Sequence, residues 1–165
     1  MSKIALITGG GSGIGLACAK TLAQNGYHTI LTGRREAALM DACKIIGEQN
    51  SSAIACDVTS AEDVDALYDK IEKDHGRLDV LFNNAGNNVN AAPIGDVPVE
   101  DFIKVINVNL IGAFIIARGA FNLMRKQDPQ GGRIINITSG QSLGPMSEEI
   151  AYAITKTTRL ALLLG

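Results

Sequence analysis

The stretch Ile4–Gly15, which reads Ile-Ala-Leu-Ile-Thr-Gly-Gly-Gly-Ser-Gly-Ile-Gly, decides the fold of this chain. Its apolar beginning, Ile4–Ile7, predicts a buried strand, and a helix is expected to follow until Asn25-Gly26 stops it. Glycines at such a junction permit a tight turn, let backbone N–H groups approach an anion, and let the helix pack closely on the strand. Because the positive end of the helix lies at the same place, the stretch predicts a pyrophosphate-binding turn. The alternative is a flexible turn, which the strand–turn–helix context disfavours.

The bulk composition is that of an ordinary single domain. The chain has 165 residues, 46% of them apolar, and a formal net charge of −2. Since neither sign of charge dominates, no nucleic acid or membrane surface is expected as a partner. No apolar run approaches the roughly 18 residues of a membrane span, and no signal peptide is expected. The three cysteines have no metal-like spacing, so reduced thiols in the cytoplasm and no metal site are predicted.

Strands and helices alternate along the rest of the chain. Further strands are predicted at residues 27–32, 53–56, 78–82 and 133–137, with helices at 35–46, 60–75, 100–126 and from about 149 or 152 to the end. Alternation of this kind predicts an α/β fold with helices on both faces of a parallel sheet. Right-handed crossovers then give a doubly wound, three-layer α/β/α Rossmann fold, in the strand order 3-2-1-4-5 and as one domain over residues 1–165.

Two features predict that the fold continues beyond Gly165. The last predicted strand, 133–137, lies at a sheet edge, although Ile134, Ile135 and Ile137 suit a strand that is buried on both faces. The last helix becomes apolar almost all round at residues 160–164. We expect a further strand or a partner chain to cover them, and the chain is therefore interpreted as truncated at its C-terminus.

The residues after the second strand bear on which dinucleotide would bind. An acid at this strand end would hold the adenosine ribose and repel a 2′-phosphate, but the chain has Gly33 followed by Arg34 and Arg35. A guanidinium can pair with a phosphate through two hydrogen bonds and stack on adenine, so NADP(H) is favoured over NAD(H). Two solvated arginines at the start of a helix are the alternative. Asp57, after the third strand, suits either the adenine amino group or the cap of a turn.

Three side chains near the C-terminus have the types needed for proton transfer. Tyr152 and Lys156 lie four residues apart, on one face of a helix, where a cation favours the phenolate. Such a tyrosine can act as an acid toward a carbonyl or a base toward an alcohol. Ser139 follows the fifth strand at the sheet edge where ligands bind, and its hydroxyl could polarise a substrate oxygen. An ordinary turn serine is the alternative there.

In this order, the glycine turn, Asn83-Asn84-Ala85-Gly86, Ser139 and Tyr152-x-x-x-Lys156 strongly resemble the short-chain dehydrogenase/reductase family of the classical type. The resemblance covers essentially the whole chain. It implies Asn109, Ser139, Tyr152 and Lys156 as catalytic residues, with Asn109 holding a water for a proton relay. The residues implied or predicted to bind the cofactor are Thr8, Gly9, Gly11, Ser12, Gly13, Ile14, Gly15, Arg34, Arg35, Asp57, Val58, Asn84, Ala85, Gly86, Tyr152 and Lys156.

The resemblance also implies an activity, and the chain differs from the family at its C-terminal end. The expected reaction is hydride transfer between NADP(H) and a small carbonyl or alcohol substrate, whose identity and direction the sequence leaves open. Family members usually continue into further strands, a loop that closes over substrate, and a turn that holds the nicotinamide carboxamide. Because these parts are missing, the alternative is a non-catalytic fragment that binds a dinucleotide or dimerises.

The predicted helix 100–126 is apolar on nearly every face, with Phe102, Ile106, Phe114 and Phe121 among its side chains. A helix of this kind needs burial on all sides, which one sheet face cannot give. In the family, this helix and the Tyr152 helix form a dimer bundle, often within tetramers. A homodimer or homotetramer is therefore expected, and burial under the missing C-terminal segment is the alternative.

Overall fold

The structure is a computed structural model that describes residues 2–144 and 148–161 and contains the predicted alternation of strands and helices. The strands are β1 (Lys3–Thr8), β2 (Tyr27–Gly33), β3 (Ser51–Ala55), β4 (Val80–Asn83) and β5 (Arg133–Asn136). The helices are α1 (Gly13–Gln24), α2 (Glu36–Ile46), α3 (Ala61–His75), α4 (Val99–Ile106), α5 (Ala113–Met124) and α6 (Ile150–Ala161). Among these residues, no helix is both long and apolar enough to cross a bilayer.

All strand pairs are parallel, and the strand order is β3-β2-β1-β4-β5, as predicted. The chain first moves outward from β1 to β3 and then crosses back, so that β4 lies on the other side of β1. Thr8 pairs with Thr32, and Asn83 pairs with Asn136, so the carboxyl ends of neighbouring strands reach one edge of the sheet. The loops after β1 and β4 diverge at this edge, which is the place where ligands bind in open α/β sheets.

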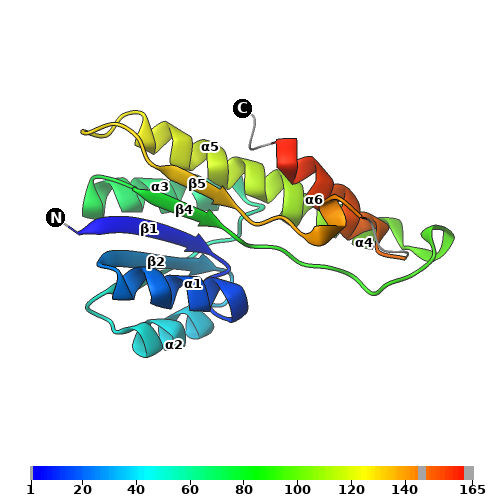
Figure 1. The fold of residues 1–165 in the computed structure, drawn as a ribbon, viewed down its shortest axis with the longest axis horizontal. Coiled ribbons are helices and arrows are strands. Elements are labelled where there is room, and N and C mark those ends of the chain that lie inside the picture. Colours follow the sequence, from blue (N-terminus) through cyan, green and yellow to red (C-terminus); the bar gives the residue numbers. More distant parts are fainter. Residues whose placement is uncertain (1, 145–147, 162–165) are drawn as a thin grey trace.

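Helices cover both faces of the sheet and form the predicted three layers (Figure 1). Ala5 and Ile7 of β1 belong to the core on the α1 and α2 side, whereas Ile4 and Leu6 belong to the core on the α3 and α5 side. This alternation follows from the period of two in a strand. The fold is thus the doubly wound Rossmann arrangement that the sequence predicts.

The turn between β1 and α1 depends on two of its glycines. Gly9 has a φ of +67°, in the left-handed region where residues with a Cβ are strained. Gly15 lies in the first turn of α1, where a Cβ would overlap the carbonyl oxygen of Gly9. The helix therefore packs directly on the turn, and its N-terminus is held at the carboxyl end of β1.

The long helix predicted at 100–126 is continuous but changes type in its middle. A π-helical segment, η2 (Asn107–Gly112), joins α4 to α5 without a break in helical backbone. Contacts to other elements lie at the end of this segment. The Ala113 carbonyl accepts a hydrogen bond of 2.9 Å from Asn83 Nδ2, and a Cβ at Gly112 would lie only 2.8 Å from Val58 Cγ2. The segment turns the Asn109 side chain inward, where it is fully buried.

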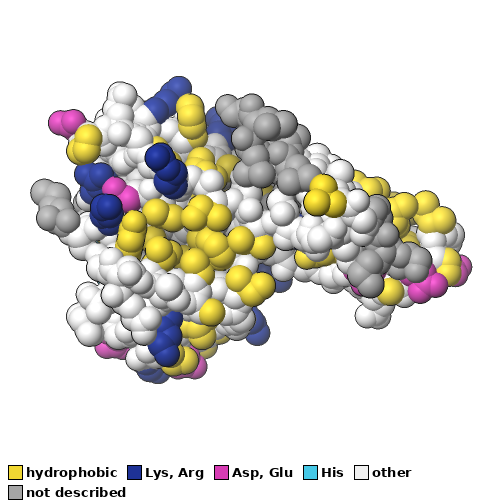
Figure 2. All heavy atoms as spheres, in the orientation of Figure 1, with side chains coloured by type: hydrophobic (Ala, Val, Ile, Leu, Met, Phe, Trp, Pro, Cys, Tyr) yellow, Lys and Arg dark blue, Asp and Glu magenta, His cyan; other side chains and the backbone are white. Residues whose placement is uncertain are grey.

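The edge strand β5 differs from its predicted burial on both faces. Ile135 is 45% exposed, because no described element covers its side of the sheet. Hydrophobic side chains gather on this face, over β4 and β5 (Figure 2). The predicted apolar end of the last helix, residues 160–164, lies outside the residues whose side chains are described.

Candidate cofactor site and catalytic residues

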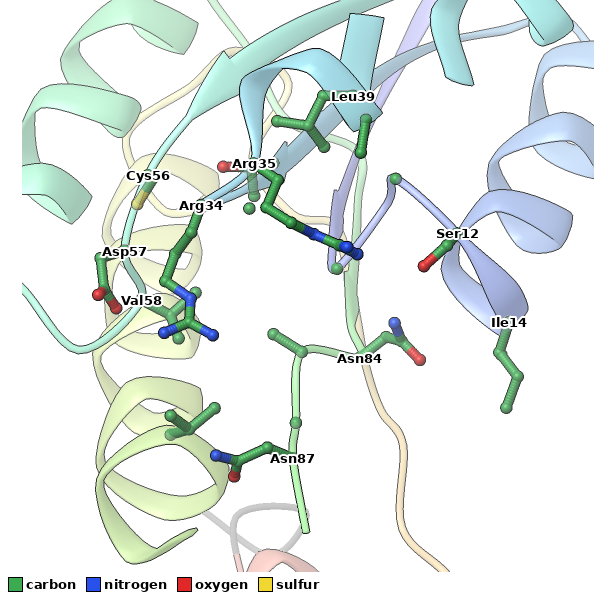
Figure 3. A pocket seen from close by; sticks show the side chains of 18 residues that line it. Ser12, Ile14, Arg34, Arg35, Leu39, Cys56, Asp57, Val58, Asn84 and Asn87 are labelled. Carbon is green, nitrogen blue, oxygen red and sulfur yellow. The ribbon is translucent and has the colours of Figure 1, made fainter. Parts of the chain in front are cut away.

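A cavity of about 380 Å³ opens at the carboxyl edge of the sheet, beside the glycine turn (Figure 3). Four segments that follow β1, β2, β3 and β4 line it, together with residues of α2 and η2. The lining residues are Gly9, Gly11, Ser12, Ile14, Thr32, Gly33, Arg34, Arg35, Ala38, Leu39, Cys56, Asp57, Val58, Asn84, Ala85, Gly86, Asn87 and Val108. A volume of this size is typical of small-molecule sites.

Thr8 lies behind the cavity and joins its two central loops. Its buried hydroxyl accepts hydrogen bonds from the backbone N–H groups of Asn84 (2.9 Å) and Ala85 (2.8 Å). The Asn84 side chain returns a bond of 3.0 Å from Nδ2 to the Thr8 carbonyl. The loops after β1 and β4 are thereby fixed to each other. Gly13 and Gly15 also shape the turn without lining the cavity.

The beginning of α1 offers hydrogen-bond donors to the cavity. Ser12 is the N-cap, in extended backbone, and its side chain makes no capping hydrogen bond within the helix. Its hydroxyl points into the cavity (Figure 3). The first turn of α1 contains no acidic residue that would compete for the helix N-terminus. Exposed N–H groups, a free hydroxyl and the positive end of a helix fit a phosphate group.

Two guanidinium groups face the cavity from the end of β2. Arg34 and Arg35 both extend into the cavity, with Arg34 next to Asp57 and Arg35 toward the glycine turn (Figure 3). The Asp57 carboxylate caps its own turn, since it accepts hydrogen bonds from Thr59 N (2.9 Å) and Thr59 Oγ1 (2.8 Å). The backbone bond from Thr59 lowers the pKa of Asp57, and the charge of Arg34 lowers it further. This side of the cavity therefore carries two guanidinium groups and one carboxylate, and the carboxylate of Asp57 is hydrogen-bonded within its own turn.

Asn87, which is not among the residues predicted to bind the cofactor, also lines this cavity. Its Oδ1 is buried and has no hydrogen-bond partner among the described residues. An unpaired buried acceptor is costly and fits a donor such as a ribose hydroxyl. The signal was available, because Asn87 directly follows Asn83-Asn84-Ala85-Gly86 in the same loop. The contributions of Thr32, Leu39, Cys56 and Val108 to the lining follow only from the folded arrangement.

Asn109 is held against the loop that carries Asn87. Its Oδ1 accepts a 2.8 Å hydrogen bond from Asn87 N, and its Nδ2 donates one of 2.8 Å to Asn87 O. These paired bonds mimic the contact between two strands. They connect the π-helical segment to the edge of the cavity, although Asn109 itself does not line it.

Tyr152 and Lys156 lie together on α6, as predicted. Lys156 Nζ lies 5.1 Å from the centroid of the Tyr152 ring, and it donates a hydrogen bond of 3.2 Å to the Ile137 carbonyl. Lys156 is only 3% exposed, which is unusual for a lysine. Its ammonium group is thus held between the phenol ring and the end of β5, outside the cavity of Figure 3.

Ser139 begins the short turn that follows β5. Its hydroxyl accepts a hydrogen bond of 3.3 Å from Gln141 N, so it caps this turn as the simpler interpretation predicted. The turn is tied to the beginning of α6, because Gln141 Nε2 donates a 2.6 Å hydrogen bond to Glu149 Oε2. Ser139 therefore lies on a segment fixed to the helix that carries Tyr152 and Lys156.

Known proteins resemble this chain in sequence and in fold. A family model described as short chain dehydrogenase matches residues 3–163. A chlorophyll(ide) b reductase NOL from the chloroplast of Oryza sativa subsp. japonica is 38% identical over 157 residues, which are 92% of this chain. An NAD+-bound xylitol dehydrogenase matches with 36% identity and a TM-score of 0.90 over 97% of the chain. An actinorhodin polyketide ketoreductase variant with NADPH matches with 28% identity and a TM-score of 0.91 over 98% of the chain.

The match covers nearly all of this chain but only part of each relative. The chain spans 46% of the length of the rice reductase and 62% of the length of each of these two solved structures. Since the family model matches residues 3–163 and the solved structures superpose with TM-scores of 0.90 and 0.91, the chain belongs to the short-chain dehydrogenase/reductase family.

Proposed function

We propose that this chain forms the cofactor-binding and catalytic part of an oxidoreductase, which transfers hydride between NADP(H) and a carbonyl or alcohol substrate. The observation that carries this proposal is the junction at Asn87. This residue lines the cavity, and its backbone is bound by Asn109 of the helix that packs against α6. The expected cofactor site and the expected catalytic residues are therefore parts of one connected arrangement.

Each candidate catalytic residue has a distinct role in the proposed reaction. The cofactor, when bound, would supply a hydride for the carbonyl carbon, and the substrate oxygen would take up a proton to give the alcohol. Tyr152 donates that proton, and the Lys156 ammonium stabilises the phenolate that is left behind. The Ser139 hydroxyl hydrogen-bonds to the substrate oxygen and polarises it. Asn109 holds a water that returns a proton toward Lys156. In the reverse direction, the Tyr152 phenolate accepts the proton of the alcohol.

The two arginines support a preference for NADP(H). A 2′-phosphate at the end of β2 would meet the guanidinium groups that Figure 3 draws in the cavity, and Arg34 can bind it through two hydrogen bonds. Gly33 leaves this strand end without a carboxylate that would repel the phosphate. The solved relatives include an NAD+ complex and an NADPH complex, so family membership alone does not decide between the cofactors.

A titration with NADPH and NADH tests the cofactor site. We expect the wild-type chain to bind NADPH at least tenfold more tightly than NADH, as measured from heat or nicotinamide fluorescence. Arg34→Ala should remove most of this preference, because a charge-assisted pair to the phosphate contributes roughly 1.5–3 kcal/mol. The matched variant Arg125→Ala, at the residue that follows α5 and does not line the cavity, should keep the preference. Equal binding of both cofactors by the wild type would contradict the NADP(H) assignment.

A carbonyl screen with Tyr152→Phe tests the chemistry. The variant keeps the aromatic ring beside Lys156 but has no proton to exchange, so turnover should fall by at least a hundredfold while NADPH affinity stays within about twofold. Full activity in the variant would refute the role of Tyr152. NADPH binding by a wild type that reduces no carbonyl would instead favour the alternative of a non-catalytic, dinucleotide-binding fragment.

We also propose that a second copy of the chain covers the exposed stripe on α4, η2 and α5, which gives a homodimer or a homotetramer. The stripe consists of Ile103, Ile111, Phe114 and Phe121, which are between 44% and 57% exposed. Large apolar side chains clustered on one helical face are typical of interaction surfaces. An oligomer would bury the apolar side chains of this helix that the sheet does not cover.

A further inference from the structure

Thr155 lies between the two candidate proton-transfer residues of α6 and is completely buried. Neither the glycine turn nor the Tyr152-x-x-x-Lys156 pattern assigns it a role. A buried hydroxyl needs hydrogen-bond partners, and Thr155 has two in the structure. These partners lie on different elements: Asn109 belongs to η2, and the Tyr152 carbonyl belongs to the first turn of α6 itself.

The two hydrogen bonds of Thr155 have defined directions. Thr155 Oγ1 donates its only hydrogen to the Tyr152 carbonyl at 2.8 Å, so its lone pairs are available to the Asn109 amide. Asn109 Nδ2 donates to Thr155 Oγ1 at 3.3 Å. The rest of the Asn109 amide is occupied by the backbone of Asn87, which fixes its orientation. A continuous chain of hydrogen bonds thus leads from the cavity wall to the backbone of Tyr152.

We infer that Thr155 is a positioning residue that sets the first turns of α6 against the loop lining the cavity. It holds Tyr152 and Lys156 at the place where the nicotinamide half of the dinucleotide would bind. This inference rests on the proposed function, since it assumes that a dinucleotide occupies the cavity with its adenosine half at the arginines. Thr155 itself touches neither the substrate nor the cofactor.

Thr158 provides a matched comparison on the same helix. Its hydroxyl donates to the Ile154 carbonyl at 2.8 Å, as that of Thr155 does to Tyr152, but its side chain is exposed to solvent. A hydroxyl bound only to the preceding turn adds little to helix stability. What distinguishes Thr155 is the link to Asn109 on another helix, and a comparison of the two residues isolates that link.

The test compares affinity for a whole dinucleotide with affinity for its adenosine half. Wild type, Thr155→Val, Thr155→Ser and Thr158→Val are titrated with NADP+ and with 2′,5′-ADP. Thr155→Val keeps the shape and removes the hydroxyl, so NADP+ affinity should fall roughly three- to tenfold, as expected for a lost hydrogen bond. The affinity for 2′,5′-ADP should stay within twofold. Thr155→Ser and Thr158→Val should match the wild type with both ligands.

The outcomes separate the inference from the proposed function. A wild type that binds neither ligand rejects the proposed function. If the wild type binds both and Thr155→Val weakens them equally, Thr155 is only structural and the inference is overturned. The inference is also overturned if Thr155→Val binds both ligands as the wild type does, or if Thr155→Ser does not restore the wild-type affinity for NADP+. If Thr155→Val does not fold, Thr155→Cys replaces it, because its thiol has a similar size and a weaker hydrogen bond.

Discussion

At the scale of single residues, Thr8 joins two loops of the candidate site. Its hydroxyl is the acceptor for two backbone N–H groups of the β4 loop. Thr8→Val has nearly the same shape but leaves both donors without an acceptor, so it should lower the free energy of unfolding by about 1–3 kcal/mol. Urea unfolding measures this loss. Thr8→Ser keeps the acceptor and should retain most of the stability, and a Val variant as stable as the wild type would contradict the role.

His28 makes stability depend on pH, far from the cavity. Its ring lies 5.0 Å from that of His75, and its Nε2 lies 3.1 Å from Ser52 Oγ. Burial lowers the pKa of His28, and repulsion from His75 lowers it further. As the pH falls, the unfolded chain therefore binds a proton at this side chain before the folded chain does. The stability that this difference contributes is present above pH 6.5 and is lost as the pH falls through the lowered pKa of the folded state.

Chemical denaturation between pH 7.5 and pH 5 measures this dependence. The free energy of unfolding should decrease toward pH 5 in the wild type and should decrease less steeply in His28→Gln, which cannot be protonated. The acidic residues with lowered pKa values, Asp57 and Asp79, titrate below this window, because even ordinary carboxyl pKa values lie near 4. Equal slopes in the wild type and the variant would rule out His28 as the cause.

At the scale of elements, the packing of α3 on α5 depends on one small residue. Tyr68 of α3 is buried and donates a 2.6 Å hydrogen bond to the Ile116 carbonyl, and its ring lies where a Cβ at Gly119 would be. Alanine normally favours a helix over glycine by about 1 kcal/mol. Gly119→Ala should nevertheless destabilise the protein, by about 1–3 kcal/mol, because a buried ring cannot move aside without cost.

Thermal unfolding of two further variants separates the steric overlap with Tyr68 from the effect of alanine on helix propensity. Gly95→Ala, where a Cβ meets nothing, should be close to neutral. In a Tyr68→Leu background, Gly119→Ala should cost less than in the wild type, since neighbouring substitutions are not additive. A stabilised Gly119→Ala protein would show that helix propensity outweighs the packing of Tyr68.

The sequence predicts these elements well wherever a local signal exists. The helix predicted at 60–75 is observed as α3, and Ser60 caps it, with its hydroxyl accepting a hydrogen bond from Asp63 N at 3.1 Å. The apolar runs give the strand order through the rules of parallel sheets. The π-helical segment was not predicted, and the contacts at its end are to Asn83 and Val58, which are distant in sequence. The same holds for Thr155, whose partner Asn109 is 46 residues away.

The candidate site follows the same division between local and distant signals. The residues of the glycine turn and of the strand ends could be assigned to one edge of the sheet from the topology, because the carboxyl ends of parallel strands meet there. Eleven predicted residues from Gly9 to Gly86 do line one cavity, whereas Thr8, Gly13 and Gly15 support it from behind. Their roles toward a cofactor stay predictions. Asn87 was not among the predicted cofactor-binding residues, because its paired hydrogen bonds with the Asn109 side chain are visible only in the folded chain.

At the scale of the whole molecule, two apolar surfaces have no cover among the described residues. One is the sheet face at Ile135, over β4 and β5, and the other is the stripe of Ile103, Ile111, Phe114 and Phe121. They lie on different sides of the molecule, because the first belongs to the α1 side of the sheet and the second belongs to helices on the opposite side. The two surfaces therefore call for separate tests of what covers them.

The stripe yields a prediction about oligomeric state. Arg118 and Arg125 flank its aromatic residues, and the Arg125 guanidinium lies 6.0 Å from the centroid of the Phe121 ring. A Phe114→Lys/Phe121→Lys variant removes apolar area and adds like charge to both copies, so it should convert the proposed oligomer to monomers. Light scattering after gel filtration measures the mass. Ile45→Lys, at a 61% exposed residue of α2, adds charge elsewhere and should leave the mass unchanged. A wild type that is already monomeric at micromolar concentration would contradict the prediction, and the stripe would then be assigned to burial within a longer chain.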